Sequence, residues 1–134
     1  MSFLPIDQAF INQFIEADFG LPIAHENAPY DPVPGTPYAE LICINNDFTP
    51  YSLANSLETE GIFRAILRYP VGGYSIAAKQ TADQILAIFP IDSLVKYGAS
   101  KSKVIKQNRN NGATEEGWYK IVVSITHKTF ISRS

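Results

Sequence analysis

The chain has 134 residues, of which 46% are hydrophobic and 18% are charged, with one cysteine and a net charge of −2. A chain of this length can bury one hydrophobic core without disulfides, and its composition excludes a disordered protein. The lone Cys43 excludes an intramolecular disulfide, and no apolar run reaches the roughly 18 residues of a membrane helix. We therefore expect a globular protein of a reducing compartment with no membrane partner.

Charge is divided unevenly along the chain. Residues 1–63 carry nine acidic residues and no lysine or arginine, for a formal charge of −9, whereas residues 64–134 carry eleven basic and four acidic residues, for +7. The two halves can neutralise each other within one copy, or an acidic face can meet a basic face of a neighbouring copy. The sequence leaves both explanations open.

The first predicted element is an amphipathic helix over residues 5–19. Apolar side chains recur there at spacings of three and four, including Ile6, Phe10 and Phe14, and Gly20 follows as a stop signal. We expect the phenylalanine stripe to face the core rather than a partner, because a surface helix buries its apolar side.

Prolines separate the next two predicted strands. A short strand is expected over residues 21–27, and the four prolines that follow exclude a regular ladder and keep the backbone extended. Residues 38–45 alternate well enough for a second strand. Residues 46–60 are expected to form a long polar connection that exposes Phe48 and Tyr51.

The second half predicts a strand over residues 60–69, an amphipathic helix over 74–89 and a last strand over 118–126. In the strand over residues 60–69, apolar side chains on one face alternate with isoleucine side chains and arginine stems on the other. In the last strand, Val122 on the polar side indicates a central position in the sheet. Residues 96–113 hold five basic and no acidic residues with abundant Gly, Ser and Asn, which predicts a mobile basic arm or ribbon.

This order of elements predicts an α+β fold with a mixed, mainly antiparallel sheet of about four to five strands, flanked by two main helices. We expect a single domain over residues 1–134, with a flexible basic loop or arm at about 96–116.

Few residues are available for catalysis or metal binding. The two histidines, His25 and His127, lie far apart in sequence, and neither a Gly-x-Ser-x-Gly motif nor a phosphate-binding glycine motif is present. We therefore expect no enzyme and no catalytic, cofactor-binding or metal site. The basic segment with nearby aromatics leaves a small nucleic-acid-binding module as an alternative function.

Three blocks of sequence follow one another in a characteristic order. Residues 26–32, ENAPYDP, form a Glu-Asn-apolar-Pro-aromatic-x-Pro segment, and residues 35–38, GTPY, form a Gly-x-Pro-Tyr step into a strand. Residues 60–72, EGIFRAILRYPVG, form a strand that closes with Tyr-Pro before an Ala-rich helix. In this order and spacing, the blocks resemble the tail terminator (tail completion) proteins of long-tailed bacteriophages.

The resemblance implies an α/β sheet protein that assembles as a homo-hexameric ring on the end of the tail tube. The ring would stop polymerisation of the tail tube protein and provide the attachment surface for the head–tail connector or a neck protein, with DNA only as passing cargo. It also implies a virion protein at the head-proximal end of the tail, assembled in the host cytoplasm, without catalytic residues or cofactors. A neck or head-completion connector protein is the alternative within this class.

An acidic half and a basic half suit the heterologous contacts that such a ring requires. The stiff backbone of residues 28–37 loses little entropy on docking, so we expect it to act as a fixed edge or strap between subunits. The candidate interface residues are Tyr30, Phe48, Tyr51, Lys101, Lys103, Lys106 and Arg109.

Overall fold

The structure, a computed structural model, describes residues 4–25, 30–33, 35–45, 49–50, 56–73, 75–97 and 100–132. Two helices and eight strands occur in these residues, in the order α1 (Leu4–Ala17), β1 (Ile23–His25), β2 (Tyr38–Asn45), β3 (Thr49–Pro50), β4 (Ser56–Pro70), α2 (Ser75–Ile88), β5 (Leu94–Tyr97), β6 (Ser100–Arg109), β7 (Ala113–Glu115) and β8 (Trp118–Ser132). Neither described helix is long and apolar enough to cross a membrane.

All eight strands belong to one sheet, in the order β1-β2-β4-β8-β6-β5, with β3 added to β4 and β7 added to β8. The β1–β2 pair is parallel and the other pairs are antiparallel. The prediction of an α+β fold with two helices and a mixed, mainly antiparallel sheet is confirmed. The predicted strand count of four to five is too low, because β3, β5, β6 and β7 form where connections were expected.

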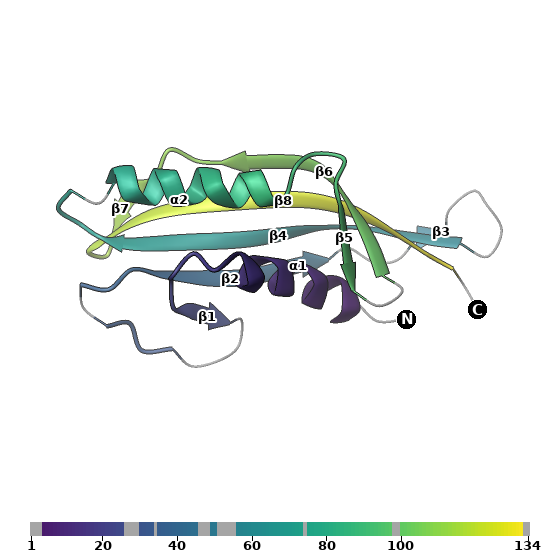
Figure 1. The fold of residues 1–134 in the computed structure, drawn as a ribbon, viewed down its shortest axis with the longest axis horizontal. Helices are drawn as coiled ribbons and strands as arrows, with labels where there is room; N and C mark the ends of the chain where they lie inside the picture. Colours follow the sequence, from purple (N-terminus) through teal and green to yellow (C-terminus); the bar gives the residue numbers. More distant parts are fainter. Residues whose placement is uncertain are drawn as a thin grey trace.

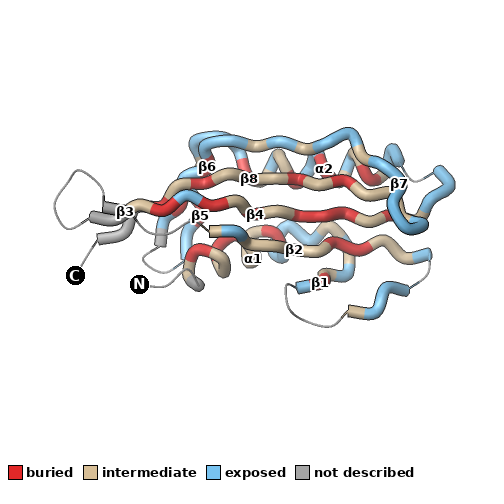
Figure 2. The backbone as a smooth tube through the Cα atoms, turned by 180° about the vertical axis from the view of Figure 1, so that it is seen from behind, coloured by how far each residue is buried: buried red, intermediate tan, exposed pale blue. Residues whose placement is uncertain are grey.

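The long strands β4 and β8 form the centre of the sheet. They pair over their whole length, from Ser56 with Ser132 to Pro70 with Trp118. β8 lies between β4 and β6, so its predicted central position is confirmed. Figure 1 shows both helices on the near side of the sheet, and Figure 2 shows the opposite face, which neither helix covers.

The alternation predicted for β4 is also confirmed. Phe63, Ala65 and Leu67 are buried in the core beneath the helices, whereas Arg64 and Arg68 are half-buried on the other face. The stems of the arginines cover part of the apolar sheet surface while their charged groups stay near water. The uncovered face is therefore mixed in polarity.

Helix α1 supplies the centre of the core. Ile6, Phe10 and Phe14 lie on one helical face and are at most 2% exposed, which confirms the predicted stripe. The ring of Phe10 stacks on both Phe63 of β4 and Phe89 after α2, with centroid distances of 5.6 Å. This one side chain thus joins the sheet to both helices.

The two helices cover the sheet side by side. α2 packs on β4, β6 and β8 through the small residues Ala78 and Ala82 together with Ile85. α1 packs on β5 and β6. Since β5 is the edge strand farthest from β1, its contact with α1 shows that this edge of the sheet curls over the helix, as Figure 1 shows.

Paired strands occupy most of the segment for which a flexible basic loop or arm was expected. β5 pairs with β6, and both β6 and β7 pair with β8. Val95, Ser102 and Val104 are buried, whereas Lys101 and Lys103 are exposed, so the segment follows the two-residue period of a strand. Lysines and small polar residues concealed this period in the sequence. The structure therefore replaces an irregular arm by strands, and the flexibility of the segment stays a prediction.

Gly61 on β4 occupies a position with no room for a side chain. A Cβ atom added there would lie 2.6 Å from the carbonyl oxygen of Ile44 on β2 and 2.9 Å from Cε1 of His127 on β8. We predict that Gly61→Ala lowers the free energy of unfolding by about 1–3 kcal/mol, because the strands must shift to admit the methyl group. Urea denaturation measures this change, and an unchanged transition midpoint would contradict it.

Candidate interaction site

The described residues contain no cluster of three or more His, Cys, Asp or Glu side chains that could hold a metal ion. His25 is exposed on β1, His127 is buried on β8, and Cys43 is half-buried on β2. The structure brings none of these together into a described metal cluster, and the absence of catalytic and cofactor sites stays a prediction. Two described surfaces carry charged and aromatic groups that can contact other molecules.

His127 packs in the hydrophobic core. It is 3% exposed, its ring stacks on Phe10 at a centroid distance of 4.3 Å, and its Nδ1 has no hydrogen-bond partner among the described residues. Burial disfavours the charged ring and lowers the pKa of His127 from 6.5 to about 4. At neutral pH this histidine is an uncharged packing residue.

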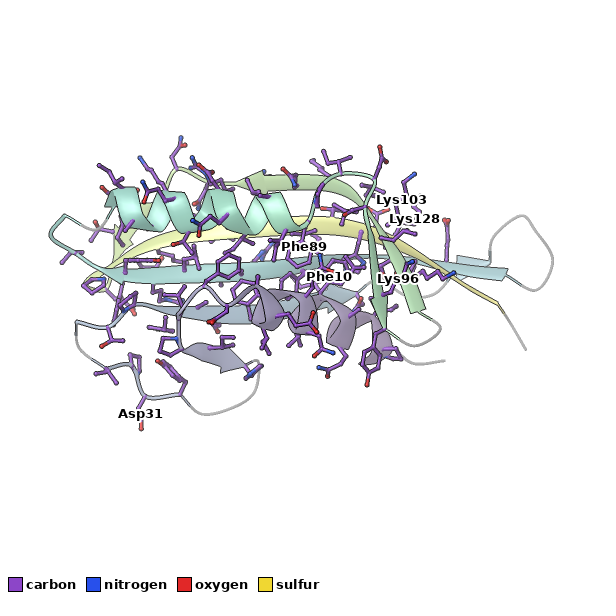
Figure 3. All side chains as sticks on the ribbon, viewed as in Figure 1. Phe10, Asp31, Phe89, Lys96, Lys103 and Lys128 are labelled. Carbon is purple, nitrogen blue, oxygen red and sulfur yellow. The ribbon has the colours of Figure 1, made fainter. Side chains whose placement is uncertain are left out.

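Five lysines gather on the uncovered face of the sheet near the β5–β6 end. We call this group the lysine face, and its members are Lys96, Lys101, Lys103, Lys106 and Lys128. Cross-strand partners project from the same face, and the register places Lys96 opposite Lys101 and Lys103 opposite Lys128. Figure 3 shows Lys96, Lys103 and Lys128 close to one another. Like charges directly opposite each other repel, so this surface favours an anionic partner.

A β-bulge determines which basic residues of β6 share this face. The register shifts between Val104 and Lys106, so one extra residue brings Lys106 to the side occupied by Lys103. Arg109 lies three residues further on and therefore on the opposite side, where its Nε donates to Asp83 of α2 at 2.6 Å. The structure thus brings together the predicted candidates Lys101, Lys103 and Lys106, and it separates Arg109 from them.

A cleft of about 370 Å³ lies at the other end of the sheet, and we call it the aromatic cleft. Its aromatic lining comes from Tyr30 in the proline-rich segment, Tyr38 on β2 and Trp118 on β8. The ring centroids of Tyr30 and Tyr38 are 4.8 Å apart, and Trp118 meets Tyr38 edge-on at 5.3 Å. The aromatic cleft is also lined by Ala24, His25, Pro32, Glu40, Arg68, Glu115 and Glu116.

Ion pairs neutralise part of the aromatic cleft. Arg68 donates from Nη1 to Oε1 of Glu40 at 2.6 Å. Glu115 meets Lys120 at a longer distance of 3.4 Å, and Glu116 is exposed and forms no ion pair with a described residue. The aromatic cleft therefore presents carboxylates without full compensation beside aromatic rings.

The lysine face and the aromatic cleft lie far apart on the same sheet. Along the β4–β8 pair, Arg68 is opposite Lys120 at the cleft, and Glu60 is opposite Lys128 at the lysine face, eight residues away on β4. At about 3.4 Å per residue this separation is roughly 27 Å. Figure 3 shows the same polarity, since Asp31, next to the cleft residue Tyr30, lies at the opposite end from the labelled lysines.

Few of the ion pairs between described side chains join the acidic half of the chain to the basic half. Among the described side chains, the Arg68–Glu40 pair joins the acidic half to the basic half. The Lys103–Asp92, Arg109–Asp83 and Lys120–Glu115 pairs each lie within the basic half. Lys96, Lys101 and Lys106 take part in none of these ion pairs, so their ammonium groups can contact a second molecule.

The structure places only one of the three aromatic interface candidates. Tyr30 lies in the aromatic cleft, whereas Phe48 and Tyr51 lie outside the described residues. Sequence analysis missed Tyr38, Trp118 and Glu116 as neighbours of Tyr30. Their one local signal is Gly117, because glycine favours the tight turn that carries Trp118 to the end of the sheet.

Comparison with known proteins adds a family and a fold. A family model described as "Phage tail terminator protein" matches residues 5–127. No curated protein matches the sequence. Nine chains of solved structures match. One of them, whose name states no function, has a TM-score of 0.75 and 18% sequence identity and covers 100% of this chain and 99% of that chain. At this identity the structural match shows the fold alone.

The burial of His127 predicts that the protein loses stability as the pH falls from about 6.5 to about 4. In this range the unfolded chain binds a proton at His127 that the folded chain does not, so stability is complete above the unfolded pKa and decreases as the pH falls toward the folded pKa. His127→Phe should remove this pH-dependent part of the free energy of unfolding. For the shift in the pKa of His127, that part amounts to about 3 kcal/mol.

Urea denaturation of both proteins between pH 7 and pH 4 measures the effect. His25→Phe, at an exposed position, is the matched control and should keep the wild-type dependence on pH. If the His127→Phe and wild-type stabilities decrease in parallel, His127 does not titrate on unfolding as its burial requires.

Proposed function

This chain belongs to the phage tail terminator protein family, a family of structural rather than enzymatic phage tail proteins, and we propose how it acts in assembly. Copies of the chain form a homo-hexameric ring that caps the end of the tail tube and stops further addition of tail tube protein. The ring lies at the head-proximal end of the tail, provides the attachment surface for the head–tail connector or neck protein, and lets DNA pass as cargo. The whole chain acts as a single domain without catalytic activity.

The observation that carries this proposal is the presence of two unlike charged surfaces on one chain. In a ring, each copy presents one patch to the copy before it and a different patch to the copy after it. The lysine face is basic, whereas the aromatic cleft carries exposed carboxylates at the other end of the sheet. Their complementary charges and wide separation support a heterologous contact between copies.

Two alternatives use some of the same features. A neck or head-completion protein could also form a ring, and it would bind tails that are already terminated. A nucleic-acid-binding module could use the lysine face to contact phosphates. Glu60, which lies opposite Lys128, and the carboxylates of the aromatic cleft weaken attraction for a nucleic acid along the sheet, and the chain is net acidic at −2. These charges favour a protein partner over DNA.

Controlled polymerisation of the tail tube protein of the same phage tests the proposed function. With the chain present, we expect short tubes that carry a cap at one end and do not elongate there when fresh tube protein is added. Electron microscopy of the tube lengths measures this outcome. Continued elongation at both ends would contradict a terminator, and binding only to tails that are already terminated would favour the neck protein.

The lysine face gives a second prediction. Reversal of Lys101, Lys103 and Lys106 to glutamate should weaken ring formation, because exposed charges contribute strongly to encounter and register. The melting temperature should change little, because the reversals relieve the Lys96/Lys101 and Lys103/Lys128 repulsions but also remove the exposed Lys103–Asp92 pair. Sedimentation velocity and thermal unfolding of the same samples measure the two effects.

Salt and a matched variant serve as controls for this prediction. At about 0.5 M salt, wild-type assembly should also weaken, since the Debye length falls well below the roughly 10 Å found at 0.1 M. Lys79→Glu on α2 makes the same kind of charge reversal on the helical side and should leave assembly unchanged. Normal assembly of the triple variant at low salt would show that the ring forms through other surfaces.

A further inference from the structure

We propose that the aromatic cleft is the receptor for the lysine face of the next copy, so that a lysine side chain of one subunit enters the cleft of another and contacts its aromatic rings and carboxylates. This inference rests on the proposed ring and specifies its contact. It assigns Trp118, Tyr38 and Glu116 to an intersubunit site that the sequence pattern did not reveal.

The chemistry of the aromatic cleft suits a cationic side chain. The faces of tryptophan and tyrosine rings attract ammonium and guanidinium groups, and tryptophan does so most strongly. The cleft already shows this preference within one copy, because the guanidinium carbon of Arg68 lies 5.7 Å from the ring centroid of Tyr38. Trp118 and Tyr30 add two further aromatic walls beside this pair.

Carboxylates at the edge of the aromatic cleft supply the negative charge. Glu40 is engaged by Arg68 and Glu115 by Lys120 at 3.4 Å, whereas Glu116 has no ion-pair partner among the described residues. Glu116 and Gly117 both have positive φ values, of 53° and 83°, in the turn between β7 and β8. Glycine, asparagine and aspartate favour the conformation that Glu116 adopts, so the turn places a carboxylate at the cleft despite its backbone preference.

The lysine face concentrates positive charges that carboxylates of a partner would stabilise. Its opposed pairs, Lys96 with Lys101 and Lys103 with Lys128, bring like charges together across neighbouring strands. Two described carboxylates lie nearby: Asp92, which is 3.4 Å from Lys103 and is itself largely exposed, and Glu60, which lies opposite Lys128. Carboxylates supplied from outside the subunit would relieve this repulsion.

The two surfaces cannot meet within one copy. They are separated by roughly 27 Å along the central strands, at about 3.4 Å per residue, which is far beyond the reach of a lysine side chain. A DNA partner would account for the lysine face but not for the aromatic cleft, whose exposed carboxylates repel phosphate. A second copy of the chain accounts for both surfaces with one contact.

A charge exchange between two variants tests the contact. The cleft variant carries Glu115→Lys and Glu116→Lys, and the lysine variant carries Lys101→Glu and Lys103→Glu. Each variant alone should self-associate at least about tenfold more weakly than the wild type, since each contact then loses most of its charge complementarity. An equal mixture should recover association, because each lysine variant can then contact cleft variants on both sides with opposite charges.

Sedimentation velocity over a range of concentrations, up to about 1 mM, detects even weak contacts of this kind. Glu16→Lys on α1 and Lys79→Glu on α2 are the matched controls; each alone should associate like the wild type. Trp118→Ala in otherwise wild-type protein should also weaken association. Circular dichroism of every variant shows that the fold is retained.

Three outcomes would overturn the contact. The first is a mixture that associates no better than its components, and the second is a wild-type chain that stays monomeric throughout the concentration range. The third is a lysine variant that associates normally but no longer binds a DNA duplex, measured by fluorescence anisotropy, which would assign the lysine face to phosphate.

If the cleft variant still caps tail tubes while its mixture shows no recovery, this inference fails and the proposed terminator function stands. If the wild type caps no tubes, the proposed function itself fails.

Discussion

The antiparallel pairing of β4 with β8 is the constraint on which the rest of this structure depends. The strands have 15 residues each and keep one register from end to end. Side chains alternate between the two faces, so this register decides which residues enter the core. A slip of one residue would expose Phe63 and bury Arg64, so the apolar contacts with Phe10 fix the register as firmly as the hydrogen bonds do.

The same pair of strands also separates the two surfaces that carry the proposed function. Arg68 and Trp118 lie toward one end, and Glu60 and Lys128 lie toward the other. Because the helices cover one face of the sheet, the other face remains open along this whole length, as Figure 2 shows. The core thus determines both the distance between the aromatic cleft and the lysine face and their orientation on the subunit.

Sequence analysis identified the elements whose signal is apolar and periodic. The stripe of Ile6, Phe10 and Phe14 and the alternation of residues 60–69 each predicted the face that the structure buries. The β5–β6 hairpin was not identified, because its buried positions include only two valines among lysines and serines, and a bulge breaks its period after Val104. Local composition could not reveal strands that form by pairing with β8.

The aromatic cleft was beyond prediction for a different reason. Tyr30, Tyr38 and Trp118 come from a proline-rich segment and two strands, and Trp118 follows the others by 80 residues or more. Their proximity depends on the registers of β2 and β8 with β4, which a single sequence does not specify. Tyr30 was selected from its sequence context, but its partners required the folded sheet.

Electron cryo-microscopy of tails that carry this chain tests the central claim most directly. The account predicts six copies in a closed ring at the head-proximal end of the tube, with density for a lysine of each copy inside the aromatic cleft of its neighbour. A ring whose copies meet through other surfaces, with the aromatic cleft open to solvent, would contradict the proposed contact. Copies distributed along the tube, or absent from its end, would contradict the terminator function.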